Sequence, residues 1–538
     1  MRISLVFTGL ILFVSWTSAE STAPTAGEVL YRRGVLTSGS PVAGGRESGG
    51  STSGVNAACV NCHRPSGLGT VEGRTVIPPI TAKYLFRPGV TVGPGAAAHQ
   101  VVHTGPSRMA YTDETLVRAI RDGVDPNGRQ LDYLMPRYNL DDATMGSLIA
   151  YLKQLSSGPT PGVAEDTLHF ATIITPDADP VKRKGMLDVL ERFFAAKNAF
   201  YRPLPPPQRS TTRMMYHVPR KWQLHVWDLV GEPETWNGQL QKRLQSEPVF
   251  AVISGLGGKD WSPVHRFCER EALPCFFPNV DLPVDAERDF YDVYFSGGVL
   301  LEARLIAHRL QKEAKTSGMR CVVQVYREDD IGAAAAQSLH DALAASGIAT
   351  MNRPVKPRAD GDKLAAETET AGTKDALVLW LRPDDLRNLP IEPPRSAEVF
   401  VSGLMGGLED SPIKGVWRGA ARMAYPFELP ERRAALLNYP LGWFKIQQIP
   451  VVAERTQVDT YVACGIVSEN LGNMLDNFVR DYLLENVEVM LSTRVVNGYY
   501  KRFGLAPGQR FASKGGYIVR LAGEEGRKLV PEGDWIVP

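Results

Sequence analysis

The sequence predicts a multidomain protein in which a small all-α domain precedes a larger, two-lobed α/β domain. The first observation is length: 538 residues, 43% of them hydrophobic and 22% charged, are enough for about two to four domains with cores of their own. The second is a run of Ser, Gly, Pro and Thr at 156–162, which interrupts the helical pattern before it. The third is the alternation of short apolar runs with helical stretches from Leu168 onward, which is typical of a mostly parallel sheet.

The charges of the chain are almost balanced. Lys and Arg number 60 against 59 Asp and Glu, which gives a formal net charge of +1. Binding to nucleic acid or to anionic lipid depends on clustered positive charge, and this composition gives no sign of it. We therefore expect no nucleic-acid partner.

The first residues resemble a secretory signal. Met1 and Arg2 are followed by an almost entirely apolar run, 3–16. The next residues, Thr17, Ser18 and Ala19, provide the small side chains of a cleavage site. The alternative is an uncleaved membrane anchor, but this run is shorter than the roughly 20 apolar residues that cross a bilayer. We expect a signal peptide at residues 1–19, cleavage near Ala19, and a periplasmic mature chain without a transmembrane span.

The segment Cys59-Val60-Asn61-Cys62-His63 fits the pattern for covalent c-type haem attachment. Two thiols at this spacing reach the two haem vinyl groups, and the following His supplies an axial nitrogen. The alternatives are a redox-active pair of cysteines or half of a zinc site. The first is typical of a βαβ context and the second needs another ligand pair nearby, and neither is present. The sequence therefore predicts one haem c bound by Cys59 and Cys62, with His63 on the iron.

An electron-carrying haem iron needs a sixth ligand, usually Met or His. Downstream candidates are Met109, Met135, His99 and His103. We predict Met135, because the following Pro136 stops any helix and favours a stiff loop that could hold the sulfur. Met109 is interpreted as a core residue.

A helix is expected directly after this loop. Asp141 and Asp142 can cap its start. The apolar residues behind them recur at helical spacing: Met145, Leu148, Ile149, Leu152 and Leu155.

With these features, residues 20–157 resemble a class I c-type cytochrome domain. The resemblance rests on 27–31 as an N-terminal helix, Cys59 to His63, Leu134-Met135-Pro136 as the distal loop, and 148–152 on a closing helix. It implies an all-α fold whose first and last helices cross beside the haem. That crossing would bring Gly27 and Tyr31 against Tyr151. Two insertions, 37–54 and 84–108, depart from the family pattern.

Beyond a linker at 158–166, the remaining residues, 167–538, show the α/β pattern. Strands are expected at 168–174, 224–229, 249–254, 275–278, 293–296, 321–326, 376–381 and 399–402, with a final strand at 517–521. Helices are expected at 181–197, 233–245, 263–272, 299–315, 333–346 and 459–485. So many strands fit two α/β lobes better than one small sheet.

This order resembles a type I periplasmic solute-binding protein of the branched-chain amino-acid binding kind, on the strings 248–255, 271–275 and 325–332. The resemblance implies two lobes that close over a small-molecule ligand, bound by loops at the carboxyl ends of strands. By position, Ser254 and Tyr326 would contact that ligand. The alternatives are that Ser254 caps a helix and that Tyr326 packs within its lobe.

The solute itself is unassigned. An amino-acid ligand would need a carboxylate for its ammonium group, and the sequence offers several: Asp177, Asp179, Asp329, Asp330 and Glu409. An aromatic or alcohol-like ligand is the alternative, given five scattered tryptophans: Trp227, Trp236, Trp261, Trp380 and Trp417.

Four cysteines remain outside the haem motif. Cys268 and Cys275 are expected at a helix end and at the start of the next strand, so an oxidising compartment favours a local disulfide between them. The alternative is two buried reduced thiols. Nothing in the sequence pairs Cys321 with Cys464.

These features together predict an exported electron-transfer protein with one covalent haem c, fused to a solute-binding domain and serving a periplasmic oxidation pathway through a redox partner protein. The alternative is a solute-binding component of an ABC-type importer with an accessory haem domain. A haem-linked oxidoreductase is a third hypothesis, but no second cofactor motif supports it, so we do not expect an enzyme. The Gly-rich run 254–259 lacks the Gly spacing of a phosphate-binding loop and carries Asp260 where Ser or Thr would be required.

Overall fold

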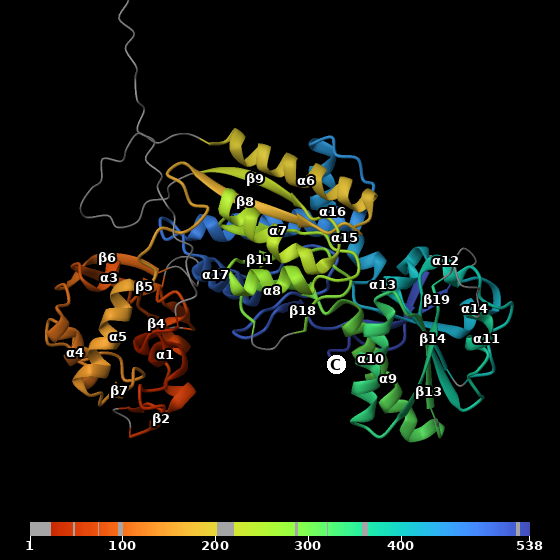
Figure 1. Ribbon diagram of the computed structural model, residues 1–538, viewed down its shortest axis with the longest axis horizontal. Coiled ribbons are helices and arrows are strands. Elements are labelled where there is room, and N and C mark those ends of the chain that lie inside the picture. Colours follow the sequence, from red (N-terminus) through yellow and green to blue (C-terminus); the bar gives the residue numbers. More distant parts are fainter. Residues whose placement is uncertain are drawn as a thin grey trace, which may run out of the picture. The chain divides into compact units, whose positions relative to one another are not determined.

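The computed structural model describes ten segments: residues 23–46, 49–73, 75–94, 101–201, 220–285, 289–319, 321–357, 364–396, 398–522 and 528–538. The chain divides into two compact units, residues 1–158 and 159–538 (Figure 1). The predicted signal segment 1–19 lies outside the described residues, and the predicted linker 158–166 stays a prediction.

The first unit is built around two crossing helices, α1 (Ala26–Arg33) and α5 (Asp142–Gln154). They approach so closely that a Cβ on Gly27 would lie 2.1 Å from the carbonyl oxygen of Ser147, so only glycine fits there. The rings of Tyr31 and Tyr151 are in contact, with centroids 5.3 Å apart. The predicted crossing of the first and last helices is confirmed.

The cap of α5 is also confirmed. The carboxylate of Asp141 accepts a hydrogen bond from the amide of Thr144 at 2.7 Å, which satisfies one of the unpaired donors at the helix start. The helix then buries the apolar stripe that its spacing predicts, against Leu30 and Tyr31 of α1 and Leu116 and Ile120 of α4 (Asp113–Asp122).

The first unit is not purely helical, so the all-α prediction needs correction. The inserted Gly/Ser-rich segment forms β1 (Ala43–Gly45) and β2 (Ser51–Ser53), which pair with β7 (Arg137–Tyr138) in the order β2-β1-β7. The second insertion contributes a hairpin. Extended insertions satisfy their backbone hydrogen-bonding groups by pairing with each other where no helix continues.

The remaining elements of the first unit are the 3-10 helix Gly54–Ala57, α2 (Val60–His63), α3 (Ala82–Leu85), and the antiparallel pairs β3 (Thr70–Glu72) with β4 (Thr75–Ile77) and β5 (Gly89–Pro94) with β6 (Val101–Arg108).

The second unit contains two sheets that belong to two lobes (Figure 1). The first lobe has a six-stranded sheet in which every described pairing is parallel. Its strands, in sheet order, are β18 (Phe511–Ser513), β12 (Asp292–Ser296), β11 (Cys275–Phe276), β10 (Ala251–Ile253), β8 (Thr167–Ile174) and β9 (Lys221–Asp228).

The second lobe has a seven-stranded mixed sheet. Five parallel strands are followed at one edge by two antiparallel ones. In sheet order they are β14 (Ala349–Val355), β13 (Cys321–Arg327), β15 (Asp375–Trp380), β16 (Glu398–Ser402), β17 (Ala421–Tyr425), β19 (Tyr517–Ala522) and β20 (Lys528–Pro531). All eight α/β strands expected from the sequence are present, and so is the final strand at 517. The sequence pattern missed β14, β17, β18 and β20.

The helices expected in the second unit are present, with one correction. The single helix expected at 459–485 is two helices, α16 (Glu454–Asn473) and α17 (Arg480–Thr493). Leu475 between them has a φ of 59°, a left-handed conformation that no α-helix continues through. The other helices are α6 (Pro180–Ala199), α7 (Pro233–Ser246), α8 (Ser262–Arg270), α9 (Gly298–Ser317), α10 (Gly332–Ala344), α11 (Leu364–Thr368), α12 (Pro383–Leu386), α13 (Gly403–Gly406), α14 (Gly415–Ala420) and α15 (Pro430–Ile446). The sequence pattern missed α11 to α15.

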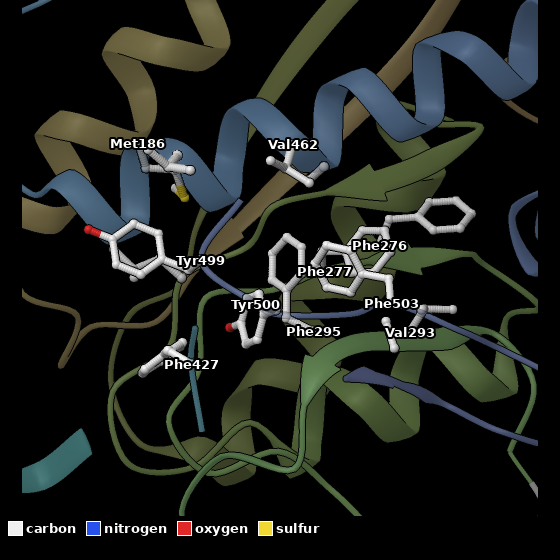
Figure 2. Packing of buried hydrophobic residues seen from close by; sticks show 14 of the residues in the cluster. Met186, Phe276, Phe277, Val293, Phe295, Phe427, Val462, Tyr499, Tyr500 and Phe503 are labelled. Atoms are coloured by element: carbon white, nitrogen blue, oxygen red, sulfur yellow. The ribbon is translucent and has the colours of Figure 1, made fainter. Parts of the chain in front are cut away.

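An aromatic cluster fills the core where the first lobe meets the C-terminal segments (Figure 2). The rings of Phe277 and Phe295 stack with centroids 4.5 Å apart, and Phe295 also stacks on Tyr500 at 5.4 Å. Phe503 packs against both Phe295 and Tyr500. The core of the first lobe is therefore completed by residues more than 200 positions after β12.

Candidate functional site

A single helical turn carries the residues predicted to attach a haem. Cys59 is the N-cap of α2, and the amide of His63 donates to the carbonyl oxygen of Cys59 at 2.9 Å. Residues three apart lie on one side of a helical turn, so Cys59 and Cys62 share a face. Cys59 is half-buried and Cys62 is exposed. This arrangement presents both sulfurs toward one side of the turn.

The imidazole of His63 is held by the backbone. Its Nδ1 lies 3.1 Å from the carbonyl oxygen of Pro78. A carbonyl oxygen only accepts hydrogen bonds, so Nδ1 carries the proton and Nε2 keeps a free lone pair. Burial lowers the pKa of His63 to about 4, despite the opposing effect of the Pro78 bond, so the ring is neutral at pH 7. A neutral imidazole fixed through its other nitrogen is the form that binds a metal.

The two thiols of this turn stay protonated at neutral pH. Burial raises the pKa of Cys59 to about 12, and burial followed by the charge of Glu72 raises the pKa of Cys62. Clusters of metal-ligating side chains in the described residues lie elsewhere and do not include this turn. The donor set therefore fits a covalently attached haem better than half of a zinc site.

Two buried tyrosines fix the segments on either side of the motif. Tyr31 donates to the carbonyl oxygen of Arg64 at 2.7 Å, and Tyr138 donates to the carbonyl oxygen of Ala57 at 2.8 Å. Both hydroxyls come from elements far from the motif in sequence. No local sequence pattern predicts these two hydrogen bonds, because they depend on the tertiary arrangement.

Met135 lies in a constrained loop, as its Pro neighbour predicts. Its amide donates to the carbonyl oxygen of Asp132 at 3.1 Å, and its own carbonyl accepts from Nη1 of Arg137 at 2.5 Å. The next residues form β7, which pairs with β1. The side chain is half-buried. The loop is thus anchored on both sides of Met135, whose assignment as an iron ligand stays a prediction.

The other candidate ligands differ from Met135 in their placement. Met109 is 60% exposed, so the interpretation of this residue as core is wrong. It lies at the end of β6, and its amide donates to Oδ1 of Asn127, which holds it at the surface. His103 pairs with Val92 in the β5–β6 hairpin, where only the backbone is described. His99 lies outside the described residues.

Residues 50–156 match the family model of cytochrome c. This match covers Cys59, Cys62, His63 and Met135. It supports a haem on the cytochrome c region, defined here as residues 50–156. The chain matches none of the curated proteins with which it was compared. In the described part of the chain, every helix is too short or too polar to cross a membrane.

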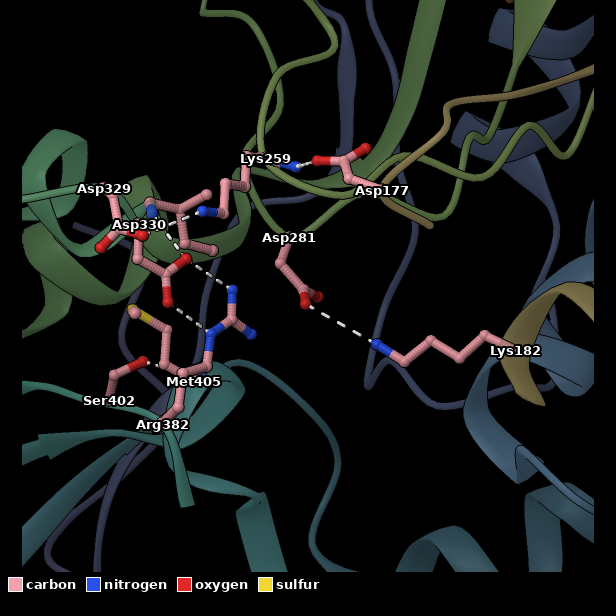
Figure 3. A network of polar contacts seen from close by, with 10 residues as sticks. Asp177, Lys182, Lys259, Asp281, Asp329, Asp330, Arg382, Ser402 and Met405 are labelled. Carbon is pink, nitrogen blue, oxygen red and sulfur yellow. Dashed lines mark hydrogen bonds and ion pairs between the residues drawn. The ribbon is translucent and has the colours of Figure 1, made fainter. Parts of the chain in front are cut away.

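In the second unit, polar side chains from the carboxyl ends of strands in both lobes face one another (Figure 3). The loop after β10 brings Lys259, and the loop after β13 brings Asp329 and Asp330. This is the edge of parallel sheets at which ligands bind in open α/β folds. We call the following set the interlobe network: Asp177, Lys182, Lys259, Asp281, Asp329, Asp330 and Arg382.

Ion pairs connect the interlobe network within and between the lobes. The amine of Lys259 lies 3.4 Å from Oδ2 of Asp329 in the other lobe, and its amide donates to Asp177 at 2.7 Å. Arg382 forms a two-pronged pair with Asp330, at 2.8 and 2.9 Å. Burial would raise the pKa of Asp330, but the bond to Arg382 outweighs it and lowers that pKa.

Asp281 of the interlobe network also pairs with Arg455, 2.8 Å away. Burial would raise the pKa of Asp281, but Arg455 and then Lys182 hold it well below its usual range. The nearby Asp459 is different, because burial raises its pKa to about 7. Arg455, Asp459 and Tyr500 border a cavity of about 10 Å³, which is room for roughly one water molecule.

The two predicted ligand contacts have different surroundings. Ser254 is fully buried, and its hydroxyl bonds to Thr460 at 2.8 Å and accepts from Asn279 at 2.9 Å. Tyr326 is half-buried at the end of β13 and packs against the core of the second lobe. Both contacts stay predictions, and the structure places Ser254 against α16 rather than among the residues of the interlobe network.

Among the carboxylates expected for an amino-acid ligand, Asp177, Asp329 and Asp330 do lie in the interlobe network. Asp179 instead caps α6, and Glu409 pairs with Arg433 at 2.7 Å. Asp281 was not among the predicted contacts, although its position shortly after β11 follows the same rule of strand ends. Arg455 was not among them either, and no local pattern connects it to that strand.

The expected disulfide is not formed. All six cysteines are free, and Cys268 and Cys275 are fully buried thiols. The hydrogen bond between the two thiols, followed by burial, raises the pKa of Cys275 well above its usual value. The prediction of a disulfide from compartment and spacing is therefore wrong for this structure, in which the two sulfurs are neighbours without a bond.

The fold of the second unit is similar to that of known binding proteins. A branched-chain amino acid ABC transporter from Thermus thermophilus with bound valine has a TM-score of 0.51 at 10% identity, covering 70% of this chain and 98% of that one. A fatty acid ABC transporter substrate-binding protein from Thermomonospora curvata has a TM-score of 0.49 at 16% identity, covering 71% and 95%. The second unit has the type I periplasmic-binding-protein fold. The likeness is one of fold alone.

Proposed function

We propose that this chain is an exported electron-transfer protein that carries one covalent haem c in its first unit and binds a small molecule in its second, within a periplasmic oxidation pathway. The observation that carries the proposal is the His63 ring. It is neutral, fixed through Nδ1 by Pro78, and adjacent to Cys59 and Cys62. The cytochrome c match over residues 50–156 supports the same assignment.

In this proposal Cys59 and Cys62 hold the haem, and His63 and Met135 bind its iron. When bound, the haem supplies one-electron transfer between ferric and ferrous iron. The protein contributes orientation: Pro78 sets the plane of the His63 ring, and the anchored loop around Met135 limits where the thioether can lie. A Met ligand favours the ferrous state and raises the potential.

The second unit binds its solute between the lobes, at the interlobe network. The charges there have both signs and belong to both lobes, so a solute that replaces the Lys259–Asp329 pair would connect the lobes in the same way. Electrons pass on to a separate redox partner protein. We assign electron transfer and solute binding to the chain, and no catalytic step.

The test is covalent attachment of pigment to the full chain. The protein is expressed in a host competent for cytochrome maturation, purified, denatured, and extracted with acidified solvent. We expect the red pigment to stay with the polypeptide. The double variant Cys59→Ser/Cys62→Ser should lose it, while Cys321→Ser, outside the motif, should keep it. Pigment that leaves the wild-type chain would overturn the proposal.

A second candidate function is delivery of a solute to an ABC-type importer, with the haem as an accessory. The fold shared with the Thermus thermophilus protein favours it. A thermal-shift screen of small molecules on the haem-loaded chain, followed by redox titration with each hit, separates the two. A change in haem potential on solute binding supports the electron-transfer pathway. An unchanged potential supports the importer.

A further inference from the structure

Three side chains from consecutive elements of the first lobe form a buried cluster. Cys268 lies on α8, Cys275 begins β11, and Asp292 begins β12. All three are 0% exposed. One ligand atom of each lies within 4.8 Å of the other two. Cys275 and Asp292 are direct neighbours across the parallel β11–β12 pair, so the sheet itself fixes their spacing.

The carboxyl group of Asp292 is enclosed by polar neighbours: Nδ1 of His265 is 3.6 Å from its Oδ2, and burial, followed by the charges of Cys268 and Glu269, raises its pKa well above the usual value. Both of its carboxylate oxygens are buried without a hydrogen-bond partner. An ionised carboxylate in such a place is very costly unless a cation or donors compensate for it. Its backbone amide donates to Glu269 at 2.8 Å, which holds the residue in position. The side chain therefore faces the two thiols with unused ligand capacity.

The polar side chains around Asp292 form hydrogen bonds with other residues. The carboxylate of Glu269 accepts the amides of Phe290, Tyr291 and Asp292. His265 bonds through Nε2 to Asp289 at 2.6 Å, and its Nδ1 is 2.8 Å from the hydroxyl of Tyr294 and 3.6 Å from Oδ2 of Asp292. His265 is thus a positioning residue beside the cluster, fixed by two neighbours.

We propose that Cys268, Cys275 and Asp292 bind one zinc ion. Two thiolates and a carboxylate are ligands that zinc accepts, and thiolates select it over magnesium or calcium. Three protein ligands leave the fourth tetrahedral position to a non-protein ligand. The ion would tie α8 to the first residue of each of two adjacent strands, and it would stabilise the ionised form of Asp292. This site is separate from the haem residues and from the interlobe network.

A disulfide between the two cysteines is the competing outcome. It would consume both thiols and would not involve the carboxylate of Asp292. Zinc uses all three groups at once. The buried carboxylate within 4.8 Å of both sulfurs is the observation that favours the metal over the disulfide.

The test uses the full chain with its haem. The chain is dialysed against Zn²⁺ under reducing conditions. Elemental mass spectrometry then measures zinc separately from haem iron. We expect one zinc per chain, and X-ray absorption at the zinc edge should show two sulfur ligands at about 2.3 Å. Asp292→Asn keeps the shape of the side chain and should weaken zinc binding at least about tenfold. Cys464→Ser, a buried cysteine outside the cluster, should leave zinc binding unchanged.

Three results would overturn the proposal. The first is a Cys268–Cys275 disulfide in the protein purified from the periplasm, found by counting thiols in denaturant without reductant. The second is the absence of stoichiometric zinc from the reduced, folded chain. The third is equal zinc affinity in Asp292→Asn or in Cys268→Ser. Circular dichroism and the haem spectrum of each variant confirm that it has folded.

Discussion

The hydroxyl of Tyr31 donates to the carbonyl oxygen of Arg64, 2.7 Å away. Arg64 directly follows His63 and has a φ of 65°, a conformation that costs a non-glycine residue energy. Tyr31 belongs to α1, so the bond ties the N-terminal helix to the end of the turn that carries Cys59 and Cys62. The first helix therefore supports the attachment motif directly.

Tyr31→Phe should destabilise the first unit by roughly 1–2 kcal/mol, because it removes a buried hydrogen bond without changing the ring. Denaturant unfolding of the haem-loaded chain, followed by the haem absorbance, measures the effect. Tyr133→Phe is the control, since Tyr133 is 58% exposed. Equal stability of the two variants would contradict the structural importance of this bond.

Met135→Ala should abolish the weak sulfur-to-iron charge-transfer band of the ferric protein and lower the haem potential, because a Met ligand favours ferrous iron. Visible absorption and redox titration provide the readouts. Met109→Ala should retain both properties, since Met109 is an exposed residue at the end of β6. If the band survives in Met135→Ala and disappears in Met109→Ala, the ligand assignment is reversed.

Phe295→Ala should cost about 3–5 kcal/mol of folding free energy, as expected for removal of a buried aromatic ring. Phe295 is 4% exposed and stacks on both Phe277 and Tyr500. Chemical unfolding monitored by circular dichroism measures the loss. Val495→Ala, at a position 91% exposed, should change stability by less than about 0.5 kcal/mol.

Because of Glu302, the free energy of unfolding should decrease as the pH rises from about 4.5 to 8. This side chain is 0% exposed and bonds to Ser402 and to the amide of Leu404. Burial raises its pKa from 4.5 to about 8, so the folded chain keeps a proton that the unfolded chain has already lost. The contribution is fully present below pH 4.5 and disappears as the pH rises through 8. Glu302→Gln should flatten this part of the curve of unfolding free energy against pH, and an unchanged slope would refute the assignment.

Asp281→Asn should destabilise the second unit by about 3 kcal/mol, because it leaves the mostly buried guanidinium of Arg455 without its anion. The matched control is Asp285→Asn, whose pair with Arg304 has side-chain exposures of 41% and 37% and should matter by less than about 1 kcal/mol. Thermal unfolding of both variants compares them. Similar losses of stability in the two variants would mean that the buried Asp281–Arg455 pair stabilises the fold no more than an exposed pair.

The sequence predicts those features whose causes are local. Cys59 to His63 lie on one turn, Asp141 caps the helix that it precedes, and the strands of the second unit are short apolar runs. The close approach of Gly27 to α5 could be anticipated only through the family resemblance, because no local pattern distinguishes this glycine from the others.

Other features depend on contacts between distant residues. Asp281 and Arg455 are 174 positions apart, so neither residue indicates the other in the sequence. The break at Leu475 interrupts an apolar pattern that continues on both sides of it. The sequence predicts only a disulfide between Cys268 and Cys275, because Asp292 becomes their neighbour only when β11 and β12 pair.

The placement of β18 affects how the second unit acquires its fold. This strand, Phe511–Ser513, completes a sheet whose first strand begins at Thr167. Synthesis proceeds from the N-terminus, so several hundred residues are made before β18 is available. Until then, the edge of the sheet at β12 has no strand to pair with. Such long-range pairing slows folding and leaves apolar surface exposed meanwhile, so a chaperone that binds the emerging chain should increase the yield of native protein.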